Sequence, residues 1–162
     1  MEELNKILNQ QIPLLAGLPP KQMHSLLEIS KMGLHHPGEI LCEYGGRSDR
    51  LLVLLRGQLE ILGEGGTLLA TIRPVTTVGE MGFLTRKPRS ATVRAKEQSQ
   101  VLAIDYLGFM KLVETDFRLQ ARIYRKAVRL LKERLSDAND LIVRYRQLAA
   151  DKQPDPQPAT PS

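Results

Sequence analysis

The stretch RLLVLLRGQLEILGEGGTLLATIRP, residues 50–74, decides the fold of this 162-residue chain. Gly57 interrupts its apolar residues once, and the run GEGG at 63–66 interrupts them again. A glycine-rich interruption between two apolar runs is typical of the turn in a β-hairpin. The stretch therefore predicts three consecutive strands, of which the last two form a hairpin.

Similar short runs on both sides extend the β region to residues 33–105. The run EILCEY (39–44) precedes the stretch and is followed by a polar turn, GGRSD (45–49). Two further runs, ATVRA (91–95) and QVLAID (100–105), lie on either side of the polar residues KEQS. Several short strands separated by glycine-rich turns indicate a β-barrel or a β-sandwich.

Helices are predicted on both sides of the β region, within residues 1–32 and 106–150. In the first block the apolar residues follow helical spacing, and the pair Pro19-Pro20 is suited to open a second helix. The run DKQPDPQPATPS at 151–162 is polar and rich in proline, so we expect a disordered tail there. The sequence thus predicts one α+β domain over residues 1–150.

The long C-terminal helix carries a seam of apolar residues spaced alternately by four and three. Its members are Tyr124, Val128, Leu131, Leu135, Ala138, Ile142, Tyr145 and Ala149. A second stripe, Leu119, Ile123, Ala127 and Leu130, widens the apolar face in the first half only. A wide face packs on a domain and a narrow heptad seam pairs with another helix. We therefore expect the first half to lie on the barrel and the second half to form a homodimer through Leu131, Leu135, Ala138, Ile142 and Tyr145. The alternative is an ordinary core helix throughout.

The composition restricts the possible partners. The net charge of +5 is compatible with anionic ligands. Aromatic residues make up only 4% of the chain and do not alternate with the basic ones, which argues against a stacking platform for single-stranded nucleic acid. The sequence contains no apolar run long enough to span a membrane, and its N-terminus does not resemble a signal peptide. The single cysteine, Cys42, fits a reducing cytoplasm.

The segment VGEMGFLTRKPRSATVRA, residues 78–95, carries the polar groups that suggest a ligand. Glycines at 79 and 82 let the backbone approach a ligand closely. GEMGFL is long enough for one or two helical turns, and a short helix with a glycine at its start would offer free N–H groups to an anion. Pro88 stiffens the approach to Arg89, whose planar guanidinium suits two phosphate oxygens. Ser90 can donate from its hydroxyl group, and Ala91 leaves its N–H accessible.

Glu80 adds a group of the opposite kind to this segment. An ionised carboxylate only accepts hydrogen bonds, so it suits the hydroxyl groups of a sugar and not a phosphate. The segment thus combines an acidic anchor for a sugar with a basic anchor for a phosphate. A cyclic nucleotide carries both of these groups in one fused ring system.

The same segment resembles the phosphate-binding cassette of the cyclic nucleotide-binding domain family. The family pattern is Gly-Glu-apolar-small, a short helix, and Pro-Arg-small-Ala-x-Val, and GEMGFL and PRSATV match it. The run PGEILCEYGGRSDRLLVLLRGQLEIL resembles the first hairpins of the family, and the likeness covers residues 14–142. It implies an antiparallel β-barrel of the double-stranded β-helix or jelly-roll type, flanked by N-terminal helices and a long C-terminal helix.

The resemblance also implies a role for each matched residue. Glu80 would accept the ribose 2′-hydroxyl, and Arg89 would pair with the cyclic phosphate. The rest of the implied ligand-binding set is Gly79, Met81, Gly82, Ser90 and Ala91. In the family, cGMP-selective sites often carry Thr after the phosphate-binding Arg, so Ser90 favours cAMP over the alternative, cGMP. The C-terminal helix would cap the base, and Arg134 or Asn139 could reach it, although both equally suit solvated positions.

These features predict a regulatory module that senses cAMP, moves its C-terminal helix and acts on an unidentified protein effector. His35-His36 fit a polar loop and Cys42 a strand, so we expect no metal, no cofactor and no enzyme activity. Transcription factors of the family continue into a helix-turn-helix domain, whereas a proline-rich tail follows here, so direct DNA reading is not expected. Two alternatives are a Crp/Fnr-like DNA-associated regulator acting through a partner and a ligand-free dimerisation domain.

Overall fold

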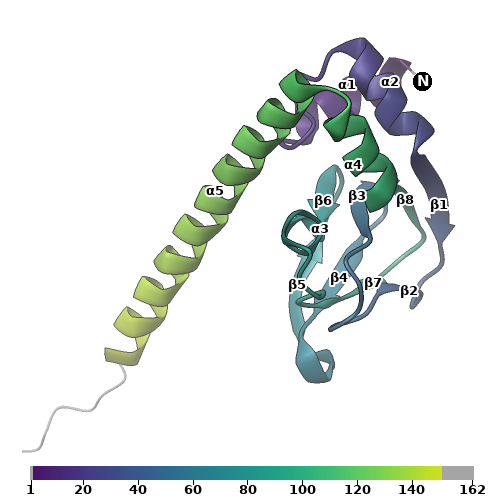
Figure 1. The fold of residues 1–162 in the computed structure, drawn as a ribbon. Helices are drawn as coiled ribbons and strands as arrows, with labels where there is room; N and C mark the ends of the chain where they lie inside the picture. Colours follow the sequence, from purple (N-terminus) through teal and green to yellow (C-terminus); the bar gives the residue numbers. More distant parts are fainter. Residues whose placement is uncertain (1, 151–162) are drawn as a thin grey trace, which may run out of the picture. The chain divides into compact units, whose positions relative to one another are not determined.

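A computed structural model describes residues 2–150 of the chain, apart from the side chains of Arg134, Ala149 and Ala150. The chain divides into two compact units, residues 1–127 and 128–162. The first unit carries the strands and the short helices (Figure 1). The tail predicted at 151–162 lies outside the described residues.

Along the chain, two helices precede the strands and two follow them. Helices α1 (Glu2–Gln11) and α2 (Pro20–Glu28) precede them, and α4 (Tyr106–Glu114) and α5 (Phe117–Ala150) follow them. The strands are β1 (Ser30–His35), β2 (Ile40–Cys42), β3 (Arg50–Arg56), β4 (Leu59–Leu62), β5 (Leu68–Ile72), β6 (Thr76–Val78), β7 (Thr92–Ala95) and β8 (Ser99–Asp105). The 3-10 turn η1 (Glu64–Gly66) joins β4 to β5, and the short helix α3 (Glu80–Thr85) lies between β6 and β7.

The strands form two antiparallel four-stranded sheets, in the orders β1-β8-β3-β6 and β2-β7-β4-β5. The hairpin of β4 and β5 closes where the Gly63 amide donates to the Thr67 carbonyl at 2.8 Å. Helices α1, α2 and α4 gather at one end of the sheets (Figure 1). The predicted α+β fold, with an antiparallel β region flanked by helices and a long C-terminal helix, is confirmed.

Strand β3 shows why its sequence is apolar at every position from 51 to 54. Leu51 and Val53 belong to a cluster of buried residues that also contains helical side chains, whereas Leu52 and Leu54 belong to a second cluster. The second cluster also contains Val93 of β7 and therefore joins the two sheets. A strand that is buried on both faces reads as a continuous apolar run and does not alternate.

The predicted helical block was wrong at its C-terminal end. It was expected to reach Met32, but α2 ends at Glu28 and β1 begins at Ser30. The Ser30 hydroxyl donates to the Leu26 carbonyl at 2.7 Å, which satisfies an acceptor at the end of the helix. From Ser30 onward the chain pairs with β8, and this long-range pairing makes the run SKMGLH a strand.

The start of α5 packs within the first unit, as its wider apolar stripe predicts. Leu119, Ile123 and Ala127 are buried in the cluster that contains side chains of α1, α2 and α4 and of strands β3 and β8. On the polar side, the Arg122 guanidinium donates to the Gly17 carbonyl, and the Lys126 ammonium group donates to the carbonyls of Pro13 and Ala16. These contacts attach the first turns of α5 to the turn that follows α1.

In the second unit, the described residues form the remainder of α5. Most of the predicted seam is exposed there, including Leu135, Ile142 and Tyr145. Leu141, Val143 and Leu148 are also exposed, so this part of the helix is apolar beyond the seam itself. Within residues 2–150, no helix contains a stretch apolar enough to cross a membrane.

Candidate functional site

The segment 78–95 forms a connection between β6 and β7 that contains the short helix α3. Gly79 precedes the helix with φ +85°, a left-handed conformation that glycine adopts without steric cost. At the other end Arg86 has φ +60° and ψ +13°, a left-handed conformation that is usually adopted by glycine at helix ends. Both ends of α3 are therefore set by left-handed residues, and the chain then leads through Pro88 to Arg89.

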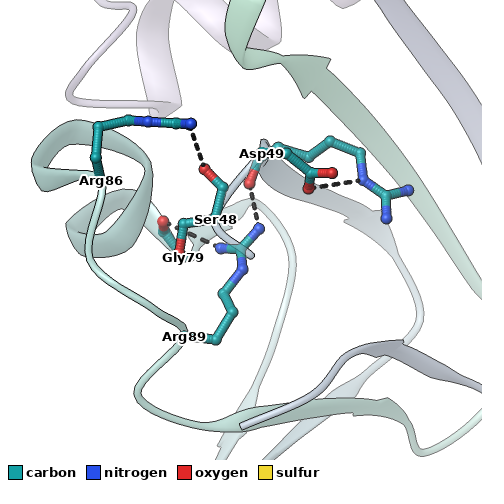
Figure 2. Close-up of polar contacts among 6 residues, drawn as sticks. Ser48, Asp49, Gly79, Arg86 and Arg89 are labelled. Carbon is teal, nitrogen blue, oxygen red and sulfur yellow. Dashed lines mark hydrogen bonds and ion pairs between the residues drawn. The ribbon is translucent and has the colours of Figure 1, made fainter. Parts of the chain in front are cut away.

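Arg89 is a buried cation held by main-chain groups. Its side chain is only 5% exposed, Nη1 donates to the Gly79 carbonyl at 3.2 Å, and Nη2 donates to the Arg50 carbonyl (Figure 2). The Nε atom is buried and has no hydrogen-bond partner among the residues that the structure describes. A guanidinium has more N–H groups than two bonds use, and a buried N–H without a partner calls for an explanation.

The loop between β2 and β3 fixes the backbone of Arg89. The Gly45 amide donates to the Arg89 carbonyl at 2.8 Å, and the Arg89 amide donates to the Gly46 carbonyl at 2.9 Å. Nearby, the Ser48 hydroxyl donates to the Lys87 carbonyl at 2.7 Å. Arg89 is therefore held in one position through its main chain as well as its side chain.

The other predicted residues lie around α3 and at the start of β7. Glu80 is the first residue of α3 and is 5% exposed, so a carboxylate and a guanidinium are both buried in this segment. Gly82 lies against Ser48, and a Cβ atom at Gly82 would stand 2.1 Å from the Ser48 hydroxyl oxygen. Met81 and Ser90 are exposed, and Ala91 is half-buried.

The charge of Arg89 acts on Cys42 at the end of β2. Burial raises the pKa of the Cys42 thiol, and the Arg89 guanidinium is the largest of the opposing influences. The thiol therefore responds to the electrostatic potential near the guanidinium. No catalytic role is needed to explain this cysteine, since a half-buried, protonated thiol behaves as a small apolar side chain.

Two residues that were not among the predicted site residues, Ser48 and Arg86, lie beside the site. Ser48 lies in the polar turn GGRSD yet is only 6% exposed, and the Arg86 guanidinium donates to its carbonyl at 3.2 Å. Arg86 also stacks on Tyr106, with its Cζ atom 3.8 Å from the ring centroid. Its left-handed position at the end of α3 is a structural feature that residue type alone does not reveal.

The candidate lid residues belong to the second unit. Asn139 is exposed on α5, and the side chain of Arg134 lies outside the described residues. Neither is therefore placed against the segment 78–95.

Residues 35–116 match the family model described as cyclic nucleotide-binding domain. The chain is 28% identical to the human cGMP-dependent protein kinase 2 over 121 residues, which cover 73% of this chain and 16% of the kinase. It is 27% identical to the cAMP-dependent protein kinase regulatory subunit of Yarrowia lipolytica over 106 residues, which cover 64% of this chain and 28% of that subunit.

A solved structure is similar over the same region. The catabolite activator protein of Thermus thermophilus has a TM-score of 0.68 and 26% identity, over 83% of this chain and 63% of that one. The chain spans only 16–28% of the length of the curated relatives that it matches. The family model covers more than half of the chain and includes the whole segment that holds Glu80 and Arg89. The chain therefore belongs to the cyclic nucleotide-binding domain family.

Proposed function

We propose that this chain is a regulatory module that binds a cyclic nucleotide at the segment 78–95. Arg89 pairs with the cyclic phosphate, and Glu80 accepts a hydrogen bond from the ribose 2′-hydroxyl. Ser90 and Ala91 donate further bonds to the phosphate, and Gly79, Met81 and Gly82 form the backbone around it. The observation that carries the proposal is the buried Nε of Arg89, an N–H that a phosphate oxygen would satisfy.

The proposed ligand is cAMP, with cGMP as the alternative. Ser90 follows the phosphate-binding arginine where cGMP-selective sites of the family often carry threonine, and this supports cAMP. The overall likeness does not separate the two nucleotides, because a cGMP-dependent kinase and a cAMP-dependent regulatory subunit are similar to this chain at nearly equal identity. A direct comparison of the two ligands is therefore part of the test.

The proposed output is a change in the position of α5, with no catalytic step. A ligand shifts a conformational equilibrium only when it binds one state more tightly. If α5 caps the base, with Arg134 or Asn139 as the lid, the capped state binds more tightly and its population rises. The effector would be either a protein that recognises α5 or a second copy of α5.

Calorimetric titration of the chain with cAMP, cGMP and a cyclic dinucleotide tests the proposal. We expect cAMP to bind most tightly, and we expect Arg89→Ala to weaken it at least about tenfold, since a charge-assisted hydrogen bond contributes about 1.5–3 kcal/mol. Glu80→Ala should weaken it as well. The matched controls are Arg73→Ala and Glu64→Ala, which remove the same charges from exposed positions around the β4–β5 hairpin. If no nucleotide binds, the chain is a ligand-free dimerisation domain instead.

A further inference from the structure

Three consecutive carbonyl groups, from the end of the β2–β3 loop to the first residue of β3, have three different partners. The Ser48 carbonyl accepts from Arg86 Nη1 at 3.2 Å, and the Asp49 carbonyl accepts from the Tyr106 amide at 2.9 Å. The Arg50 carbonyl accepts from Arg89 Nη2. We call residues 48–50 the acceptor strip. It contacts the phosphate anchor at one end and the C-terminal end of α3 at the other, with the first residue of α4 between them.

Arg86 connects the C-terminal end of α3 to α4. Its guanidinium donates to the Ser48 carbonyl (Figure 2). It also stacks on the Tyr106 ring at 3.8 Å, so one side chain contacts both the acceptor strip and α4. The Phe83 ring packs edge-on against Tyr106 with centroids 5.3 Å apart, and against Phe109 at 5.2 Å. The first turn of α4 is thus attached to the segment that holds Arg89.

The backbone of Arg86 shows that this arrangement has a cost. Arg86 is the only residue other than glycine with a positive φ among those that the structure describes. A left-handed conformation is strained for a residue with a Cβ atom, and helix ends of this kind favour glycine. The two side-chain contacts of Arg86, with the Ser48 carbonyl and the Tyr106 ring, help to offset this cost.

We infer that Arg86 is a positioning residue that transmits ligand occupancy from Arg89 to the first turn of α4. The inference rests on the proposed function of the segment 78–95. When a phosphate binds to the Arg89 guanidinium, the geometry of the hydrogen bond from Nη2 to the Arg50 carbonyl changes. The acceptor strip then shifts, and Arg86 and the Tyr106 amide carry that shift to α4, because both hold carbonyls of the same strip.

The test measures amide hydrogen exchange over Tyr106–Glu114, with and without saturating cAMP, by mass spectrometry. The variant Arg86→Gly removes the side chain but keeps a residue that adopts φ +60° freely, so it should fold. We expect it to bind cAMP within about threefold of the wild-type affinity and to lose most of the ligand-dependent change in α4 exchange. Arg86→Lys, which retains a cation near the ring and the carbonyl, should restore part of that change.

Two further variants make the result specific. Lys87→Ala removes the neighbouring cation, whose recorded hydrogen bonds use only its main chain, and should leave the α4 response intact. Tyr106→Leu removes the ring but keeps the hydrogen bond from the main-chain amide of residue 106 to the Asp49 carbonyl. It should weaken the response as Arg86→Gly does. The inference is overturned if Arg86→Gly keeps the full response. It is also overturned if this variant loses as much affinity as Arg89→Ala, because Arg86 would then be a ligand contact.

The ligand-free protein separates this inference from the proposed function. Without nucleotide, α4 amides in Arg86→Gly should exchange at least about threefold faster than in the wild type, with unchanged exchange in β3 and β8. If the wild type binds no nucleotide but this difference is present, the proposed function fails and the attachment of α4 by Arg86 stands. If the ligand-free exchange rates are equal, Arg86 does not hold α4 and the inference is wrong.

Discussion

Gly79 lies so close to the Arg89 guanidinium that a Cβ atom on Gly79 would stand 1.8 Å from Nη1. The absence of a side chain at residue 79 is therefore a condition for the buried position of Arg89. Gly79→Ala should displace the guanidinium and also place alanine at φ +85°. We expect a loss of about 1–3 kcal/mol in the free energy of unfolding, from backbone strain and the displaced guanidinium together, and cAMP affinity lowered at least about tenfold.

The control for Gly79→Ala is Gly65→Ala in the β4–β5 hairpin. Gly65 has a similar positive φ of 73°, but a Cβ atom there meets nothing within 4 Å. This variant should lose about 1–2 kcal/mol from backbone strain alone and keep its affinity for cAMP. Urea unfolding and calorimetry measure the two effects. Equal affinities for the two variants would mean that contact between residue 79 and Arg89 does not matter for binding.

The sequence predicted β3 and the short helix of the segment 78–95 because their residue types reflect their surroundings. An apolar run at 51–54 requires two buried faces, and a Pro-Arg pair after a short glycine-flanked helix is a distinctive pattern. Strand β1 was missed because its two apolar residues, Met32 and Leu34, are exposed and mark no buried face, so that its pairing with β8 makes it a strand. The acceptor strip was missed for a related reason. Its acceptors are main-chain carbonyls, which leave no trace in residue type, and Arg86 and Arg89 lie 38 and 39 positions from the residues they contact.

The reactivity of Cys42 should report on the charge of Arg89. Burial raises the pKa of the thiol, and the guanidinium partly offsets that rise. Below about pH 9, the folded protein should therefore react with iodoacetamide more slowly than the unfolded chain, because only the thiolate attacks. Arg89→Ala should slow the reaction further, since the opposing charge is gone. Bound cAMP should act in the same direction by neutralising that charge.

Rates measured from pH 7 to 10, with Arg73→Ala as the matched control, distinguish this electrostatic effect from simple shielding. If the profile of reaction rate against pH shifts to higher pH in Arg89→Ala or with bound cAMP, the charge of Arg89 acts on the thiol. A uniform decrease in rate at every pH, without a shift, would show that access limits the reaction and would contradict the prediction.

Asp116 should make the attachment of α5 sensitive to acid. Its Oδ1 atom accepts from the amides of Arg118 and Leu119 at 3.0 Å, and Oδ2 accepts from the Gln22 side chain at 2.5 Å. These hydrogen bonds favour the carboxylate and lower its pKa, with the Leu119 amide as the largest cause. A lowered pKa stabilises the folded state above the unfolded-state value of about 4, and this stabilisation is lost as the pH falls through the folded-state value.

Asp116→Asn keeps a side-chain oxygen but removes the charge. We expect it to unfold at a lower temperature than the wild type at pH 7, and the difference to be smaller at pH 3. Asp137→Asn, at an exposed position of α5, should show no such pH-dependent difference. A difference between Asp116→Asn and the wild type that is the same at both pH values would rule out the carboxylate charge as its source.

The second half of α5 should associate with a second copy of the chain. A lone helix cannot cover its own apolar seam, and the four-and-three spacing from Leu131 to Tyr145 is suited to a partner helix. Ile142 belongs to the seam, whereas Val143 is the next residue, is equally apolar and lies outside the seam, and the two are 51% and 52% exposed. Ile142→Glu should therefore weaken dimerisation at least about tenfold, and Val143→Glu should have little effect, because only the first places a charge in the seam.

Sedimentation over a range of protein concentrations measures the association of both variants. If the two variants weaken association equally, the whole apolar surface acts and the seam does not. If the wild type is monomeric at every concentration, the heptad spacing reflects contacts within one chain.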